Sequence, residues 1–275
     1  MPSSILFQST RNRRSPWAVR GELGRRSALL LALLGFAVPL LGWAFLAASG
    51  WVDAVFLPTP LGVLRRAQAW LSDDGLLGDI GISTLRVLGG FLVSAALALP
   101  LGILIGTYAP VRALLEPLTD FSRYLPAVAF IPLILLWVGI DESAKVAVIF
   151  IGTFFQMVLM LADDIAKVPQ AQIEAAQTMG ASNGEVVKFV LIPAARPAML
   201  ATLRVTMGWA WTYLVVAELV AANSGLGFSI LKAQRFLQTD KIFAGILLIG
   251  FVGLLTDQAF RWLHTWCFPW HGLRN

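Results

Sequence analysis

The sequence predicts an all-α polytopic membrane protein with about six transmembrane helices, and three observations support this fold class. The chain of 275 residues is 57% hydrophobic and has a mean hydropathy of +0.75, while only 13% of it is charged. Its apolar residues are gathered into six long segments, and the net charge of +5 lies mainly at the ends of these segments. A soluble domain of this length needs more polar surface, so lipid or partner proteins must cover most of the chain.

The predicted spans follow a basic N-terminal segment, residues 1–27, which carries six arginines and one acid. The first span, Ala28 to Ala48, is about 20 residues long, which is enough to cross a hydrocarbon core of about 30 Å and too long for a signal-peptide core. Several spans contain proline, which lipid-embedded helices tolerate when neighbouring groups satisfy the backbone. The other spans of this transmembrane domain (28–275, core about 80–265) are expected near 84–108, 124–140, 145–162, 198–222 and 242–263.

The distribution of lysine and arginine predicts the orientation. With the N-terminus inside, fourteen basic residues lie on the inner side and seven on the outer side. This excess predicts that both termini lie in the cytoplasm. The net positive charge is therefore interpreted as a signal for membrane orientation and not as a nucleic-acid-binding surface. The longest outer connection, Gly50 to Ser83, contains LPTPLGVLRRAQAWL, which is expected to form a short helix on the outer surface. The polar insert at residues 173–197 then lies on the cytoplasmic side.

This insert, IEAAQTMGASNGEVVKFVLIPAARP, predicts two short helices joined at a tight corner. The first helix is expected from Ile173 to Met179, and Gly180 ends it in the left-handed conformation. Ser182 and Glu185 have the S-x-x-E spacing of a capping box, which starts the second helix. That helix is expected to run to about Ile192, where Pro193 and Pro197 interrupt it. An amphipathic helix lying on the bilayer remains the alternative interpretation.

The motif EAAQTMG, followed by nine residues and VLIP, resembles the E-A-A-x-x-x-G-x9-I-x-L-P signature of permease subunits of bacterial ATP-binding-cassette (ABC) importers. Val190 replaces the usual isoleucine and Ile192 the usual leucine, while the spacing is kept. STLRVLGGF, LPLGILIG, RYLPAVAFIPLILLWVGI and VVAELVAANSGLGF resemble the nitrate, sulfonate, taurine and bicarbonate group, and FPWHG is most similar to its taurine-type members.

This resemblance implies a type I importer permease (MetI-like) fold in the bacterial inner membrane. It implies a homodimer with two ATPase subunits, a periplasmic or lipid-anchored solute-binding protein, and alternating access driven by ATP and Mg bound to the ATPase. None of the lysines lies in a G-x-x-x-x-G-K-[ST] motif, so neither ATP nor Mg is expected to bind this chain. No residue is expected to be catalytic. The insert would be the coupling helix that docks on the ATPase, through Glu174, Ala175, Ala176 and Gly180, with Ser182 as the helix cap.

Ionisable groups within the spans are candidates for function because burying them in a membrane is costly. Glu218 follows Arg204 by fourteen residues, hence ~21 Å along one helix, so the two cannot pair. Arg86 is the expected partner of Glu218, and a purely structural bond is the alternative to a role in transport. With Gln156, Thr212, Asn223 and Ser224, these two residues are the candidate lining of a translocation path for a small anion. The nearby Trp209, Trp211 and Tyr213 are expected to pack.

Other chemistry is not indicated. Cys267 is the single cysteine, and His264 and His271 are too isolated for a metal site. The side chains of Asp163 and Asp164 would point about 100° apart around a helix, so they do not form a carboxylate pair. Both residues are expected to begin the cytoplasmic loop. A stand-alone secondary transporter or channel would need an internal repeat or a midplane ion site, and an embedded enzyme would need a catalytic constellation; the sequence indicates none of these. The substrate stays open among taurine and other sulfonates, nitrate, bicarbonate, and uncharged or heterocyclic solutes.

Overall fold

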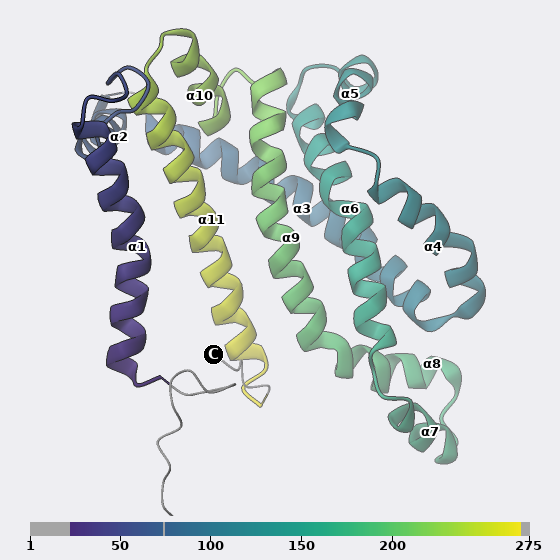
Figure 1. Cartoon of the computed structure of the whole chain (residues 1–275). Coiled ribbons are helices and arrows are strands. Elements are labelled where there is room, and N and C mark those ends of the chain that lie inside the picture. Colours follow the sequence, from purple (N-terminus) through teal and green to yellow (C-terminus); the bar gives the residue numbers. More distant parts are fainter. Residues whose placement is uncertain (1–22, 74, 271–275) are drawn as a thin grey trace, which may run out of the picture. The chain divides into compact units, whose positions relative to one another are not determined.

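The structure, a computed structural model, describes residues 23–73 and 75–270, and every regular element in these ranges is helical (Figure 1). The chain divides into two compact units, Met1–Pro60 and Leu61–Asn275, which are treated separately below. Residues 1–22 of the predicted basic segment lie outside the described residues.

The first unit contains α1, Arg25–Ala48, which confirms the first predicted span. Its 24 residues extend about 36 Å at 1.5 Å per residue. The mean hydropathy of its most apolar window is 2.3, and none of its residues is buried. A helix that is apolar on every side is stable where lipid surrounds it, since its backbone hydrogen bonds are all internal. After α1 the chain turns, and the Trp43 indole N–H donates to the Pro58 carbonyl at 2.9 Å.

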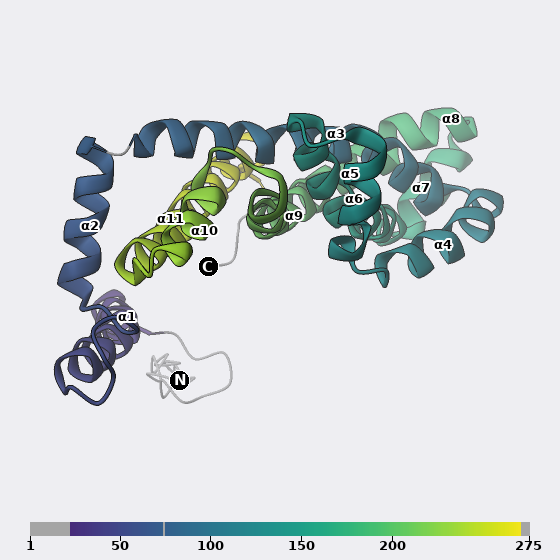
Figure 2. The same cartoon turned by 90° about the horizontal axis from the view of Figure 1, so that it is seen from above.

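The second unit is a bundle in which α3 packs against α6 and α9, and the view from above shows α3 running across the direction of α9 (Figure 2). Shorter helices join the long ones at both ends of the bundle. The elements of this unit, with the short η segments included, are α2 (Pro60–Asp73), α3 (Leu76–Thr107), α4 (Ala109–Arg123), η1 (Ala127–Phe130), α5 (Ile131–Val138), α6 (Glu142–Ala166), α7 (Gln170–Thr178), α8 (Asn183–Val186), η2 (Val187–Leu191), α9 (Ile192–Ala221), α10 (Leu226–Arg235) and α11 (Thr239–Cys267).

Glycines on α3 allow α3 and α6 to approach closely. A Cβ placed on Gly90 would lie 2.6 Å from the Ile149 side chain, and one on Gly102 would lie 2.6 Å from Leu161 Cβ. Gly106 is equally tight against the α6 backbone. Small residues at helix interfaces are the usual way for membrane helices to gain van der Waals contact, because lipid provides no hydrophobic force between them. This contact builds the main core of the bundle.

The predicted number of spans is confirmed, although several boundaries shift. Within the described residues, five helices are long and apolar enough to cross a membrane, and a sixth span results if one bent pair is counted. The span expected from residue 84 begins at Leu76 instead. The short helix expected in the loop before it is α2, which starts at Pro60.

The prediction of one continuous helix over residues 124–140 is wrong. The chain forms α4, a short η1 and α5, and the two halves, Ala109–Arg123 and Ala127–Val138, are bent by 87°. Pro126 lacks a backbone N–H and disfavours helical geometry at Leu125, so the helix ends there. With only eight residues, α5 extends about 12 Å and cannot cross a membrane alone.

The predicted helix interruption at Pro193 and Pro197 is also wrong. The segment Val187–Leu191 forms one wide π turn, and α9 continues from it through both prolines. Pro193 stands in the first turn of α9, where a missing N–H is tolerated. The corner at the insert is therefore joined without a break to a transmembrane helix, a connection that can transmit movement.

The second unit has two ends, named here by the helices that lie at them. At the α10 end, α9 finishes and α6 and α11 begin, and at the opposite α7 end, α6 finishes and α7 and α8 project beyond it (Figure 1).

Candidate functional site

The corner between α7 and α8 has the geometry that the sequence predicts. Gly180 has φ of +89°, in the left-handed region. The backbone N–H of Ser182 donates to Glu185 Oε2 at 2.8 Å, and the N–H of Glu185 donates to Ser182 Oγ at 3.4 Å, which confirms the capping box. Two reciprocal bonds hold the short second helix, which would be marginal alone.

The predicted coupling residues lie on two faces of this corner. Glu174, Ala175 and Gly180 are exposed, whereas Ala176 is only 6% exposed and packs into the main core. Met179, which the sequence analysis did not single out, is 82% exposed and lies beside Gly180 in a groove at the corner. An exposed flexible thioether beside small residues is typical of a protein-binding surface.

Arg86 forms the centre of a buried ionic cluster at the α10 end. Its Nη1 donates to Glu218 Oε1 at 2.7 Å and to the Ser224 carbonyl at 2.6 Å. Its Nε and Nη2 donate to the two carboxylate oxygens of Glu142 at 2.6 and 2.7 Å. The fork geometry joins α3, α6 and α9, together with the loop before α10, at one point.

Glu218 is fully satisfied within this cluster. Besides Arg86, Ser83 Oγ donates to its Oε1 at 2.8 Å and the Gly227 N–H donates to its Oε2 at 2.7 Å. Glu218 is 0% exposed and Arg86 3% exposed. The pair expected from the sequence therefore exists. Its burial and complete hydrogen bonding support the structural interpretation more than contact with a passing solute.

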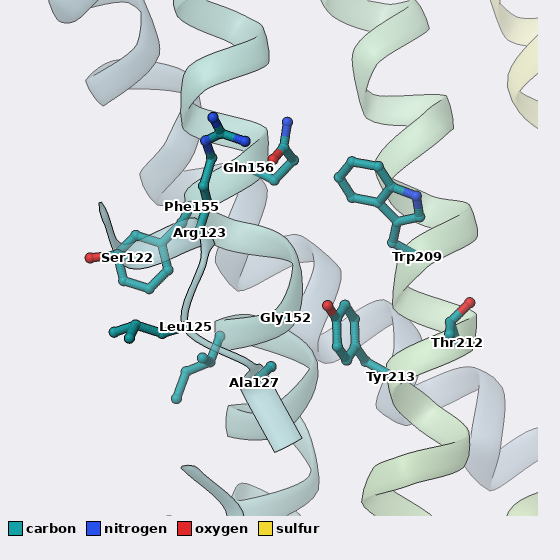
Figure 3. A pocket seen from close by; sticks show the side chains of 11 residues that line it. Ser122, Arg123, Leu125, Ala127, Gly152, Phe155, Gln156, Trp209, Thr212 and Tyr213 are labelled. Carbon is teal, nitrogen blue, oxygen red and sulfur yellow. The ribbon is translucent and has the colours of Figure 1, made fainter. Parts of the chain in front are cut away.

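Gln156 and Thr212, two further candidates, lie together on a cavity of about 250 Å³ between α6 and α9 (Figure 3). The break after α4 closes the third side, so that Ser122 and Arg123 also line this cavity. Arg123 is one of the fourteen basic residues that predicted the orientation, and it was not among the candidates for this site. The signal that could have found it is the pair of prolines in the third span, since broken spans mark binding sites in many transporters.

Asn223 lies in a separate hollow at the α10 end. This hollow also has Ser224 and the basic residues Arg66, Lys232 and Lys241 in its wall. The six candidates for a translocation path thus divide among three places: the ionic cluster, the cavity and this hollow.

The carboxylates at the end of α6 correct one expectation. Asp163 and Asp164 both lie within α6 and do not begin the loop. Asp164 is buried, and Thr202 Oγ1 of α9 donates to its Oδ2 at 2.6 Å, while Asp163 is exposed. No group of three metal-ligating side chains is found in the described ranges, and His271 falls beyond them.

A bundle of lipid-length helices, with a polar cavity inside it and a rigid helical corner projecting from one end, defines a multi-pass membrane transport subunit. The chain belongs to the family of binding-protein-dependent transport system inner membrane components, whose model matches residues 98–267. A probable ABC transporter permease protein of Brucella melitensis is 42% identical over 237 residues, which cover 86% of this chain and 95% of that protein.

Two further relatives match nearly the whole chain. The taurine transport system permease protein TauC of Escherichia coli is 33% identical and covers 98% of both chains. The bicarbonate transport system permease protein CmpB of Synechococcus elongatus is 29% identical and covers 94% of this chain and 96% of that one. Among solved structures, an inward-facing MetNI methionine ABC transporter has a similar fold, with a TM-score of 0.52 and 21% identity over 70% of this chain and 97% of that one.

The chain is therefore an ABC importer permease, a non-catalytic translocation subunit with the MetI-like fold. In such systems a partner ATPase handles ATP, and a solute-binding protein belongs to the system. Membership of this family excludes the two alternative hypotheses, a stand-alone transporter or channel and a membrane-embedded enzyme.

Proposed function

We propose that this permease imports a small anion, such as taurine or another sulfonate, nitrate or bicarbonate, across a bacterial inner membrane. Two copies would form the path, two ATPase subunits would drive it, and a periplasmic or lipid-anchored binding protein would deliver the solute. The names of relatives that match almost the full chain support the substrate class. Gln156 and Thr212 on one polar cavity support a path with hydrogen-bond donors for an anion.

The exposed corner between α7 and α8 carries the proposal for coupling. Glu174, Ala175 and Gly180 would contact the ATPase, Ala176 would support them from the core side, and Ser182 would hold the corner rigid. Because η2 connects the corner to α9 without a break, movement of the docked corner reaches a helix that lines the cavity. ATP binding would close the ATPase dimer, bring the two corners together and open the bundles outward.

The orientation follows from this docking. If the corner meets a cytoplasmic ATPase, the α7 end of the second unit faces the cytoplasm and the α10 end faces the binding protein. The excess of inner-side basic residues supports this orientation, in which both termini would lie in the cytoplasm. Residues 1–27 would then form a cytoplasmic segment ahead of a transmembrane domain over 28–275.

Co-purification with the ATPase tests the coupling assignment. The permease is co-expressed with the ATPase gene that neighbours its own, solubilised in detergent and captured by an affinity tag. Glu174→Ala and Gly180→Val are expected to lower the captured ATPase several-fold, or to leave ATP hydrolysis without solute uptake. Valine at Gly180 must adopt φ of +89°, which side chains disfavour by roughly 1–2 kcal/mol.

The matched control is Gln177→Ala, an exposed position on the same helix at which the signature specifies no residue. It is expected to retain association and transport. Wild-type transport by both Glu174→Ala and Gly180→Val would show that the docking assignment is wrong.

A further inference from the structure

We propose that the cavity between α6, α9 and the break after α4 is a binding site of the permease itself for a small organic anion, anchored by Arg123. This inference rests on the proposed import of a small anion and adds where the anion is held and which part of it is recognised. The ligand class is a single oxoanion head, such as a sulfonate, on a short apolar body.

The cavity has the size and depth for such a solute. Its volume of about 250 Å³ lies below the 300–1,000 Å³ that is typical of sites for drug-sized ligands. Gln156 lies fourteen residues after the first residue of α6 and ten before its last, hence ~21 and ~15 Å from the two helix ends. The site is thus well inside the spans, where transporters commonly hold their substrates.

Several polar groups on the cavity wall have hydrogen-bonding capacity that the protein does not use. Within the described ranges, no hydrogen bond is formed by three of these side-chain groups: the Gln156 amide, the Trp209 indole N–H and the Tyr213 hydroxyl. Thr212 Oγ1 reaches only the Gly208 carbonyl, at a long 3.5 Å. Polar groups without partners are costly inside a membrane, so water or a solute must satisfy them.

Arg123 contributes the positive charge at this wall. Its Nε donates to Asp120 Oδ1 at 3.0 Å and its Nη2 to the Tyr124 hydroxyl at 2.8 Å, which leaves Nη1 without a partner in the described chain. The pair with Asp120 is about one-third to one-half exposed and therefore weak. A guanidinium with free donors recognises planar or tetrahedral oxoanions better than an ammonium does.

The backbone break presents Arg123 at this depth. The residue ends α4, and the chain then turns by 87° into η1 and α5. In Figure 3 its side chain lies on the same side of the cavity as Gln156, opposite Trp209 on α9. The charge therefore lies at the point where the chain leaves α4 and turns away.

The wall also carries three aromatic side chains, next to aliphatic and polar ones, and these rings select the apolar body of the ligand. Phe155, Trp209 and Tyr213 line the cavity, and the Tyr213 ring lies flat against Gly152, where a Cβ would come within 2.6 Å of ring carbons. A bare inorganic anion gains little from three aromatic side chains. A short alkanesulfonate places its head at Arg123 and its carbons against these rings.

The test measures uptake and binding with defined probes. The permease–ATPase complex is reconstituted in proteoliposomes with its binding protein, and uptake of ethanesulfonate, taurine, nitrate and bicarbonate is compared. Calorimetric titration of the complex without binding protein, with ethanesulfonate, nitrate and bicarbonate as separate probes, reports the permease site alone. Arg123→Gln is expected to weaken this binding at least tenfold and to raise the KM for uptake, whereas Arg123→Lys retains part of both.

Two further variants keep the result interpretable. Thr212→Val preserves shape and is expected to weaken binding a few-fold. Arg235→Gln, the same kind of charge loss at an exposed residue of α10, is expected to leave the calorimetric titration without binding protein unchanged. ATPase capture and gel-filtration behaviour show that each variant is folded and assembled.

The outcomes separate the two proposals. If the wild-type complex takes up none of the four anions, the proposed function is wrong. If it takes up an alkanesulfonate, but Arg123→Gln and Thr212→Val do so with wild-type KM, the cavity is not the binding site. Tighter binding of nitrate or bicarbonate than of ethanesulfonate would overturn the role given to the aromatic wall.

Discussion

Two arginines within the spans of this bundle have opposite surroundings. Arg86 is 3% exposed, and its guanidinium donates to two carboxylates and a carbonyl. Arg123 lies at a helix break beside a cavity and keeps an unused donor. From this difference we infer that a charged residue in a membrane span is a candidate for function where its partners are incomplete. Completed partners make it a structural element.

The largest effect is expected from breaking the Arg86 cluster. Arg86→Met leaves Glu218 buried and without its counter-charge, which should cost about 3–5 kcal/mol of stability. Thermal unfolding in detergent should show a strongly lowered Tm, or the protein should fail to accumulate. Arg123→Gln is the matched control and should unfold close to wild type, because its side chain is exposed. Equal losses in the two variants would remove the distinction between the regions.

The second effect is partial recovery when both charges are removed. Arg86→Met combined with Glu218→Met replaces the inner pair with apolar side chains, and such replacements are often neutral or stabilising by about 1–4 kcal/mol. Glu142 stays half-exposed and can be solvated. The double variant should therefore unfold at a higher temperature than Arg86→Met alone. A lower Tm would mean that the bonds of Glu218 to Ser83 and Gly227 stabilise the fold even without the arginine.

A smaller loss is expected at another satisfied contact between helices, the bond between Thr202 of α9 and Asp164 of α6. Thr202→Val keeps the side-chain shape but removes the donor to Asp164, leaving a buried carboxylate without that bond at a cost of about 1–3 kcal/mol. Thermal unfolding of Thr202→Val and Thr202→Ser should separate the hydroxyl from the methyl group. Serine restores the donor and should recover most of the stability, whereas equal losses would assign the effect to packing.

The smallest effect on stability is expected inside the cavity. Gln156→Leu removes an amide without a protein partner, so the unfolding free energy should change by no more than about 0.5 kcal/mol. Uptake of the transported anion should nevertheless fall. A clear destabilisation of Gln156→Leu would show that its amide is a structural group like Glu218.

Much of the fold followed from local patterns. The apolar segments predicted the spans, and Ser182 with Glu185 predicted the capped corner down to its hydrogen bonds. The prediction of a continuous third span was wrong. It assumed that a membrane helix tolerates Pro126 and Pro132, whereas the chain bends by 87° there. The continuation of α9 through Pro193 was missed because a π turn, and not a helix end, absorbs the irregularity.

The candidate site was predicted only in part. Gln156 and Thr212 were chosen as polar residues in spans, and they do share a cavity. Arg86 and Glu218 were chosen by the same rule, yet they satisfy each other and neighbouring groups. Polarity within a span is visible in sequence, but whether a partner completes it depends on residues far along the chain.

The sequence by itself determined the family, the helical membrane class and the rigid corner, because helix length, capping and motif spacing are interactions among residues a few positions apart. Only the tertiary structure decided that Arg86 meets Glu218, 132 residues away, and that Arg123 meets the cavity wall of α6 and α9. Packing of α3 against α6 and the bend after α4 bring these groups together, and such long-range contacts have no local signature.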